Sequence, residues 1–203
     1  MIEKNITTIK EAMTAVRKNS WRLKYVPEEL RTVEVCSRAV KTCDGVFYEE
    51  NDTALRYVPT TLKTPELCLA AVKKNGEALL YIPGNMLTME MCLEAVKNYH
   101  EFFHYVPEKF RTVELCLATL NNTGMALELI PERLRTAEVC LAAVRRCGGA
   151  LVFVPNNLKT VKLCRIAVKS RFGNNVIQFV PEELRAQVEA VGSTVPQSLP
   201  NSQ

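Results

Sequence analysis

The sequence of 203 residues lacks the features that mark membrane, secreted or strongly electrostatic proteins. No run of 18 apolar residues occurs, and the N-terminal stretch MIEKNITTIKEAM has no apolar segment after a basic one, so neither a membrane span nor a secretion signal is predicted. The formal net charge is only +4, which is small for a dedicated nucleic-acid binder. These absences predict a cytoplasmic protein without a membrane partner.

Recognisable catalytic motifs are also missing. The sequence shows no Ser-His-Asp set, phosphate loop, paired-carboxylate cleft or nucleotide fingerprint. Its only two histidines, His100 and His104, are four residues apart, which on one continuous helix could share a metal ion, but no third ligand is apparent. We therefore expect no enzyme, no metal and no cofactor.

A repeat of about 24 residues fills most of the chain. It reads T-x-E-x-C-x-x-A-V-K, then x-x-G-x-A-L-x-Y-V-P-x-x-L-[RK], as in KTPELCLAAVKKNGEALLYIPGNML at 63–87. Four successive proline-to-proline intervals are 24 residues, the first is 32 because GVFYEEND at 45–52 is inserted, and the last is 26. The seven marking prolines are Pro27, Pro59, Pro83, Pro107, Pro131, Pro155 and Pro181.

Each repeat is predicted to form a three-turn helix followed by a short helix or 3₁₀ turn. A threonine stands where an N-cap hydroxyl is wanted, a glutamate follows in the first turn, and a glycine such as Gly76 suits a left-handed C-terminal cap. Apolar residues 1, 3, 4, 7 and 8 positions after the threonine predict a buried stripe, which the residue three after the proline should complete. The predicted caps are Thr8, Thr32, Thr64, Thr88, Thr112, Thr136 and Thr160.

Because one 24-residue unit cannot bury its own apolar face, the repeats should stack into an all-α, right-handed-type α-solenoid. We predict a single domain at 1–191 and a disordered tail at 192–203. The units are expected at 8–31, 32–63, 64–87, 88–111, 112–135, 136–159 and 160–185, followed by a partial cap.

Six of the eight cysteines recur at one repeat position, four residues after the threonine. Helices stacked about 8 to 10 Å apart hold such residues too far apart for disulfides, so free, buried and reduced thiols are predicted, as in cytoplasmic proteins. Cys43 and Cys147 lie off this position and are candidate reactive thiols, Cys147 because it follows Arg145 and Arg146. The recurring cysteines are Cys36, Cys68, Cys92, Cys116, Cys140 and Cys164.

The segments AAVKKNGEALLYIP and AAVRRCGGALVFVP resemble tandem A-V-x-x-x-G-x-A-L repeats of bacterial, protist and large-virus proteins that are grouped as a domain of unknown function. The similarity extends over 8–184. It implies an all-helical fold and no established activity. The unit length is also similar to that of leucine-rich repeat variants, some of which accompany an iron–sulfur cluster, but the clustered cysteines that such a cluster requires are missing here.

Two basic positions recur, one at the end of each three-turn helix and one just before each threonine. They could follow a phosphate backbone, or they could compensate helix dipoles and pair with nearby glutamates. Few exposed aromatic residues are expected between them for base stacking. The second position holds Arg31, Lys63, Arg111, Arg135, Lys159 and Arg185.

We predict a non-enzymatic scaffold that binds a protein or peptide partner along its repeat face. The alternatives are an electrostatic nucleic-acid binder and an effector or toxin-neutralising protein, and oligomerisation through an exposed end is compatible with each. The insertion around 45–52 is either a binding loop or a neutral bulge. The residues predicted to contact the partner are Lys73, Lys74, Lys97, Tyr99, His104, Arg145, Arg146, Lys169 and Arg171.

Overall fold

The computed structural model of the chain describes residues 6–42, 53–170 and 175–190, and all regular elements in these ranges are helices. The insertion at 45–52, Cys43, Arg171 and the tail at 192–203 lie outside them. The chain divides into two compact units, unit 1 at 1–122 and unit 2 at 123–203, with the boundary inside the fifth repeat. The expectation of one domain at 1–191 stays a prediction.

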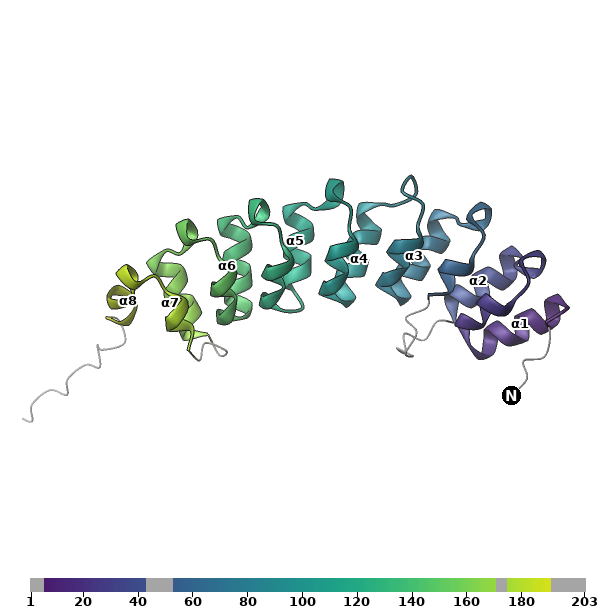
Figure 1. Cartoon of the computed structure of the whole chain (residues 1–203), viewed down its shortest axis with the longest axis horizontal. Helices are drawn as coiled ribbons and strands as arrows, with labels where there is room; N and C mark the ends of the chain where they lie inside the picture. The colour runs from purple at the N-terminus through teal and green to yellow at the C-terminus, as the bar shows by residue number, and fades with distance from the viewer. Residues whose placement is uncertain (1–5, 43–52, 171–174, 191–203) are drawn as a thin grey trace, which may run out of the picture. The chain divides into compact units, whose positions relative to one another are not determined.

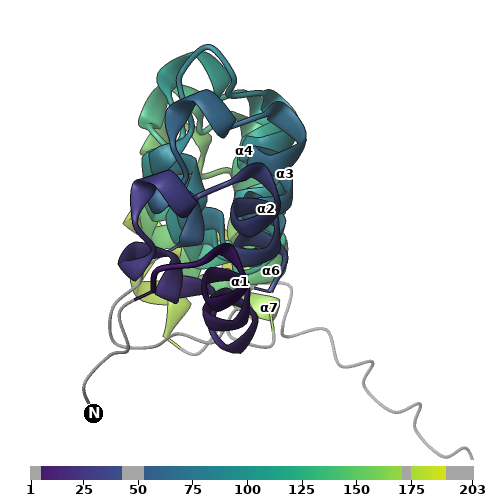
Figure 2. The same cartoon turned by 90° about the vertical axis from the view of Figure 1, so that its right-hand side faces the viewer.

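Unit 1 consists of two layers. In Figure 1, helices α1 to α5 follow one another in chain order, and each packs against the next. Figure 2 shows α1 to α4 on one side of this unit and the 3₁₀ segments on the other. The α-layer contains α1 (Ile9–Lys18), α2 (Val33–Lys41), α3 (Pro65–Lys74), α4 (Met89–Asn98) and α5 (Val113–Leu120). The 3₁₀ layer contains η1 (Ser20–Tyr25), η3 (Ala54–Tyr57), η5 (Gly76–Tyr81) and η6 (His100–Tyr105), with the short turns η2 (Glu28–Leu30), η4 (Thr60–Leu62) and η7 (Glu108–Phe110) between repeats.

Unit 2 repeats the same pattern. Helix α6 packs on α7 and α7 on α8, while η8 packs on η10 and η10 on η12. The α-helices are α6 (Ala137–Arg146), α7 (Val161–Lys169) and α8 (Glu182–Glu189). The 3₁₀ segments are η8 (Gly124–Leu129), η9 (Glu132–Leu134), η10 (Gly148–Phe153), η11 (Asn156–Leu158) and η12 (Val176–Phe179).

The threonine N-caps are confirmed in all seven repeats. Each hydroxyl accepts a hydrogen bond from the backbone N–H three residues later, as Thr64 does from Leu67 at 3.2 Å. Thr8 and Glu11 form the complete capping box. Since these caps satisfy N–H groups that a helix leaves unpaired, the threonine sets where each α-helix begins.

The second element of every repeat is entirely 3₁₀. Up to six residues long, it exceeds the usual three or four. The side chains of Asn19, Asn75 and Thr123 initiate it by accepting a hydrogen bond from the backbone N–H two residues later. It ends at the valine or isoleucine before the proline, in the extended conformation that this position favours.

The predicted role of the repeat glycines is wrong. Gly76, Gly124 and Gly148 are buried first residues of 3₁₀ segments, and none adopts the left-handed conformation. A Cβ on Gly124 would overlap the carbonyl oxygen of Ala143, and one on Gly148 would overlap that of Ala167. At Gly124 and Gly148, glycine therefore allows close packing of a 3₁₀ segment against the end of the next α-helix, whereas Gly76 lies against the Phe102 ring.

The core lies between the two layers and includes the recurring cysteines. Cys36 and Cys92, for example, are fully buried, as are Leu55 and Phe103 in the 3₁₀ segments that pack on the same two helices. The first position after the threonine was expected in the buried stripe, but Val33 is 65% exposed. The residue three after the proline is half-buried in every repeat rather than part of the core. The buried apolar face of each repeat is therefore narrower than predicted.

The six recurring thiols are free and buried, as expected, and Cys147 is free and half-buried. Burial raises the pKa of Cys36, Cys92 and Cys116 to about 11, because a thiolate would lose its hydration. The Cys36 thiol donates to the carbonyl oxygen of Arg31 at 3.5 Å. These thiols are packing groups rather than nucleophiles. No helix among the described residues is long and apolar enough to cross a bilayer.

Candidate binding surface

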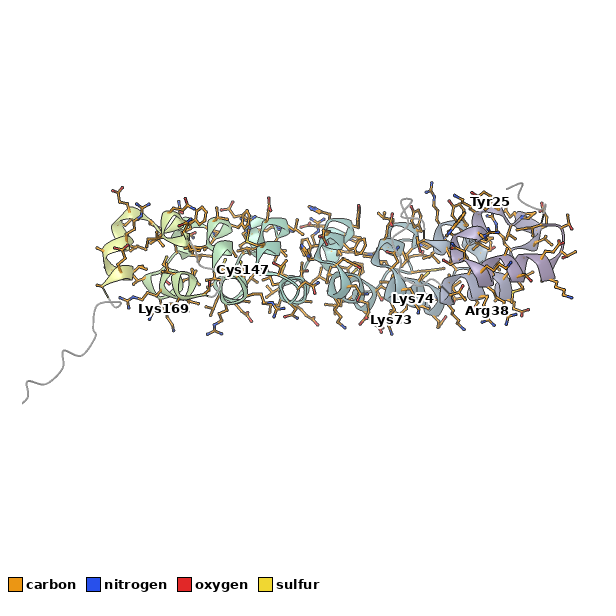
Figure 3. All side chains as sticks on the ribbon, turned by 90° about the horizontal axis from the view of Figure 1, so that it is seen from below. Tyr25, Arg38, Lys73, Lys74, Cys147 and Lys169 are labelled. Carbon is orange, nitrogen blue, oxygen red and sulfur yellow. The ribbon has the colours of Figure 1, made fainter. Side chains whose placement is uncertain are left out.

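The predicted contact residues of unit 1 lie mostly at one edge of its α-layer. Lys73 and Lys74 end α3, Lys97 ends the neighbouring α4, and Tyr99 is the C-cap of α4. All four are exposed, and Figure 3 shows Lys73 and Lys74 on the α-helix side of unit 1. Lys97 forms an ion pair with Glu94 in the preceding turn. Cations at this edge stabilise the negative ends of the helix dipoles.

The remaining predicted cations belong to unit 2. Arg145 and Arg146 end α6 and are exposed, and Lys169 ends α7. The outer face of α7 carries a shallow depression lined by Val161, Lys162, Arg165, Ile166 and Lys169. Figure 3 places Lys169 on the α-helix side of unit 2. The structure thus separates the predicted set into a lysine edge on unit 1 and a cationic surface on unit 2.

His104 is exposed on the 3₁₀ layer and does not join the lysine edge. It lies in η6 with His100, whose Nδ1 is 3.4 Å from a Glu101 carboxylate oxygen. Because a 3₁₀ helix has three residues per turn, side chains four apart point in different directions. Within the described ranges, no group of His, Cys, Asp and Glu could hold a metal ion.

Five of the six basic residues at the second recurring position donate hydrogen bonds to backbone carbonyl oxygens. Arg31 donates from Nε to the Val26 carbonyl oxygen at 2.8 Å and from Nη1 to that of Tyr57, in the next repeat, at 3.0 Å. In unit 2, Arg135 makes the same pair with Ile130 and Phe153, at 2.8 and 2.7 Å. We call these residues clasps. Lys63 donates to the next repeat, whereas Arg111 and Arg185 donate to carbonyl oxygens of their own repeats, and Arg111 also pairs with Glu108.

A column of tyrosines occupies the surface of the 3₁₀ layer in unit 1, two residues before each proline. We call Tyr25, Tyr57, Tyr81 and Tyr105 the tyrosine column. Tyr25 and Tyr105 are 43% and 47% exposed, and the other two are half-buried. Figure 3 shows Tyr25 on the side opposite Lys73 and Lys74. In η5 the period of three turns Leu79 inward, which leaves Leu80 and Tyr81 nearer the surface.

Cationic side chains lie against the rings of this column. The Lys24 ammonium is 4.9 Å from the ring centroids of both Trp21 and Tyr25. The Arg56 guanidinium is 5.8 Å from the centroids of both Tyr57 and Tyr81, so these two rings, from successive repeats, are less than 12 Å apart. Such cation–π contacts are favourable and fix the spacing of the rings.

The clasps also position the column. The carbonyl oxygen of Tyr57 accepts from Arg31, and that of Tyr81 accepts from the Lys63 ammonium at 2.7 Å. Tyr57 and Tyr81 are therefore held at their backbones by the preceding repeat, while their rings stay near the surface. A ring anchored in this way loses little further freedom when a partner binds.

In unit 2 the same repeat position holds Leu129, Phe153 and Phe179, all half-buried. The residues just before them are Glu128, Val152 and Gln178, all exposed. Unit 2 thus presents neither a hydroxyl nor a cation at the two positions that form the surface column in unit 1.

The tyrosine column was missed in the sequence, and the expectation of few exposed aromatics between cations is wrong for unit 1. The usable signal was the pair of a basic residue and a tyrosine recurring before V-P, as in Lys24–Tyr25 and Arg56–Tyr57. The sequence does not show that these tyrosines are exposed, because a tyrosine at a regular helical position is equally consistent with a core residue.

The two units also differ in charge. Residues 1–122 contain 16 Lys and Arg and 16 Asp and Glu, so their formal charge is zero. Residues 123–203 contain 10 and 6, and so carry the whole +4. Unit 1 therefore presents aromatic rings with local cations, whereas unit 2 presents the general positive field.

Comparison with known proteins gave one family. Residues 88–135 match the model of a domain of unknown function, DUF4116. The match begins at the cap Thr88 and ends at the clasp Arg135, so it covers the two repeats at 88–111 and 112–135. No curated protein and no solved structure gave a match. The part of the chain that is similar to this family is thus two successive repeats.

Proposed function

We propose that the chain is a non-enzymatic protein-interaction module and that the tyrosine column is its binding surface. The observation that carries this proposal is the half-exposed column itself, with Lys24 against the Tyr25 ring and Arg56 between the Tyr57 and Tyr81 rings. Tyrosine and arginine are enriched at protein interfaces, because a rigid ring supplies contact area at low entropic cost. The buried free thiols support a reducing compartment such as the cytoplasm.

Affinity capture from a lysate of the source cells tests the proposal. The bait is the tagged full chain, washed with high salt and nuclease, and the captured proteins are identified by mass spectrometry. We expect a stoichiometric protein with the wild type, retained by Lys74→Ala and lost with Tyr81→Ala and Tyr105→Ala. Equal capture by all variants would refute the column as the binding surface.

Nucleic-acid binding by unit 2 is the second candidate, favoured by its net charge and by the cations of α6 and α7. Arg145, Arg146, Lys162 and Lys169 are exposed, and no ion pair is found for them among the described residues. The test is the salt dependence of binding to a fluorescent oligonucleotide, whose logarithmic slope counts the phosphates neutralised. We expect a smaller slope for Lys162→Gln and Lys169→Gln; no binding at 50 mM salt would exclude this candidate.

A further inference from the structure

We infer that the depression on the outer face of α7 binds a phosphate monoester carried on an aromatic ring, as in a phosphotyrosine side chain of a partner protein. The site lies in unit 2, apart from the tyrosine column, so this inference goes beyond the proposed function. The chemistry of the ligand follows from three cations in the depression, from the apolar residues beside them and from the departure of α7 from the repeat pattern.

The depression brings three basic side chains together on one helix face. It has a volume of about 440 Å³, in the size range of small-ligand sites, and is lined by Val161, Lys162, Arg165, Ile166 and Lys169. With about 3.6 residues per turn, the three cations are neighbours around the helix, and Val161 and Ile166 lie on either side of them. A doubly charged anion with an apolar group beside it matches this order.

No acidic partner neutralises these cations in the part of the chain that the structure describes. Lys162 and Lys169 are exposed, and neither forms an ion pair there. Arg165 donates from Nη2 to the carbonyl oxygen of Gln187, in α8, at 2.7 Å, and its Nε–H is buried without an acceptor among the described residues. Since a guanidinium has five N–H groups, this one bond holds Arg165 at the depression and leaves further donors for a ligand.

Helix α7 departs from the other repeats at two of these positions. Two residues after the threonine, helices α2 to α6 each have a glutamate in the first turn, whereas α7 has Lys162 and no acid there. Five residues after it, α3 to α6 have a leucine, whereas α7 has Arg165. A lysine in the first turn opposes the helix dipole, and like charges three or four residues apart repel. Because Lys162 does not favour the helix, a ligand is the better reason for it.

A single doubly charged group fits this site better than an extended polyanion. The helices on either side of α7 carry exposed acids, Glu138 on α6 and Glu182 and Glu183 on α8, which a long phosphate backbone would approach. A dianion confined to the depression has only cationic and apolar neighbours, because none of the lining residues is acidic. A phosphate monoester supplies up to two charges and three acceptor oxygens. An aromatic carrier supplies the apolar surface that Val161 or Ile166 can contact.

Fluorescence anisotropy with labelled peptides tests the inference. The probe is a phosphotyrosine flanked on each side by Gly-Ser-Gly-Ala; the controls are the same peptide without the phosphate, the peptide with phosphoserine instead, and an oligothymidine of twelve nucleotides. We expect the full chain to bind the probe about tenfold more tightly than the unphosphorylated peptide and severalfold more tightly than the phosphoserine peptide. Phenyl phosphate should displace the probe at lower concentration than inorganic phosphate does. Equal affinity for any two of the three peptides, or tighter binding of the oligonucleotide, would overturn the inference.

Variants locate the probe on the chain. Lys162→Glu and Arg165→Leu introduce the residues that the other repeats hold at these positions, and each should weaken binding of the probe about tenfold. The melting temperature of Lys162→Glu should stay the same or rise, since a glutamate suits the first turn. Arg146→Gln, on α6, removes a charge outside the depression and should leave the affinity unchanged. An equal loss with Arg146→Gln would assign binding to the general charge of unit 2 and overturn the site. If Arg165→Leu disturbs α8, Lys162→Glu decides the question.

This inference and the proposed function can fail separately. Tyr81→Ala and Tyr105→Ala should leave binding of the phosphotyrosine probe unchanged, because the probe binds in unit 2. If cellular capture depends on these tyrosines while the probe does not bind, only the inference is wrong. If the probe binds through Lys162 and Arg165 while no captured protein depends on the tyrosines, only the proposed function is wrong.

Discussion

The 3₁₀ layers of the two units have the same backbone arrangement but present different side chains to solvent. Both have the same clasps, made by Arg31 in unit 1 and Arg135 in unit 2. In unit 1 a basic residue and a tyrosine precede V-P in two repeats, whereas unit 2 has Val152 and Phe153 at these positions.

This difference distinguishes the side chains that the fold requires from those that it does not require. Leu129, Phe153 and Phe179 are half-buried at the column position, so packing there needs only an apolar side chain. The hydroxyls and interleaved cations of unit 1 therefore exceed what the fold requires. Surplus chemistry of this kind, repeated in register, is the physical reason for assigning binding to unit 1.

The substitution Val144→Asp should have the largest effect. Val144 is fully buried in α6, and an unpaired carboxylate there should lower the free energy of unfolding by about 3 to 5 kcal/mol. Hydrogen exchange should show the loss in unit 2 before unit 1, because repeat stability is mainly a sum over neighbours. The exposed Arg146→Asp is the control, and normal melting of Val144→Asp would contradict the assigned core. Leu67→Asp should cost less, since Leu67 is only half-buried.

Alanine at the repeat glycines should affect the units unequally. In unit 2 a Cβ on Gly148 meets the Ala167 carbonyl and the Ser170 hydroxyl, whereas in unit 1 a Cβ on Gly76 meets only the Phe102 ring. We expect losses of about 2 to 3 kcal/mol for Gly148→Ala and about 1 kcal/mol for Gly76→Ala in urea unfolding. Gly84→Ala, which meets nothing within 4 Å, is the control. Equal losses at the two buried glycines would show that the ring is as fixed as the backbone.

Removing a clasp should cost the same in either unit. Arg31→Met and Arg135→Met each leave two or more carbonyl oxygens without their donor, and each should lower the free energy of unfolding by about 1 to 3 kcal/mol. Arg146→Met, exposed on α6, should have no measurable effect. A clear inequality between the two clasps would mean that the backbone frame is not shared.

Alkaline pH should weaken unit 1 through its thiols. The pKa of Cys36, Cys92 and Cys116 is raised from 9.0 to about 11, so the unfolded chain releases these protons first. Stability is therefore complete below pH 9 and should fall as the pH rises from 9 to about 11. Urea unfolding at several pH values measures this slope. Cys92→Ala should flatten it, and an unchanged slope would exclude the thiols as its cause.

The smallest expected effect concerns the tyrosine hydroxyls, which the fold should not require. Tyr105→Phe in unit 1 and Phe153→Tyr in unit 2 should each change the free energy of unfolding by less than about 0.5 kcal/mol, because the ring is kept and the hydroxyl lies near solvent. Thermal melting compares both with the wild type. A loss above 1 kcal/mol for Tyr105→Phe would make the hydroxyl part of the fold.

The frame of the fold was predictable because it depends on local rules at a fixed period. Thr64 caps its own helix, and Cys68 follows four residues later on the buried face, whatever the neighbouring repeat contains. The predictions that failed concern contacts between repeats. The partner of Arg31 is a carbonyl 26 residues away, and the reason for Gly148 is the end of the next helix. Neither atom can be located from one repeat alone.

The binding surface was less predictable for a related reason. Lys73, Lys74 and Lys97 are where their helix register predicts, but a charge at a helix end has a sufficient structural role. Predicting the tyrosine column requires knowing that the second element is a 3₁₀ helix. Only its period of three residues turns Leu79 toward the core and leaves Tyr81 near the surface.

The clasps have one further consequence, for how such a chain can change in length. Arg31 and Arg135 grip carbonyl oxygens of the following repeat, an atom that every residue supplies. This hydrogen bond therefore makes no demand on the identity of the neighbouring side chain. A gene that gains or loses one 24-residue module needs no compensating substitution to keep this bond, and the outward positions can diversify while it stays the same.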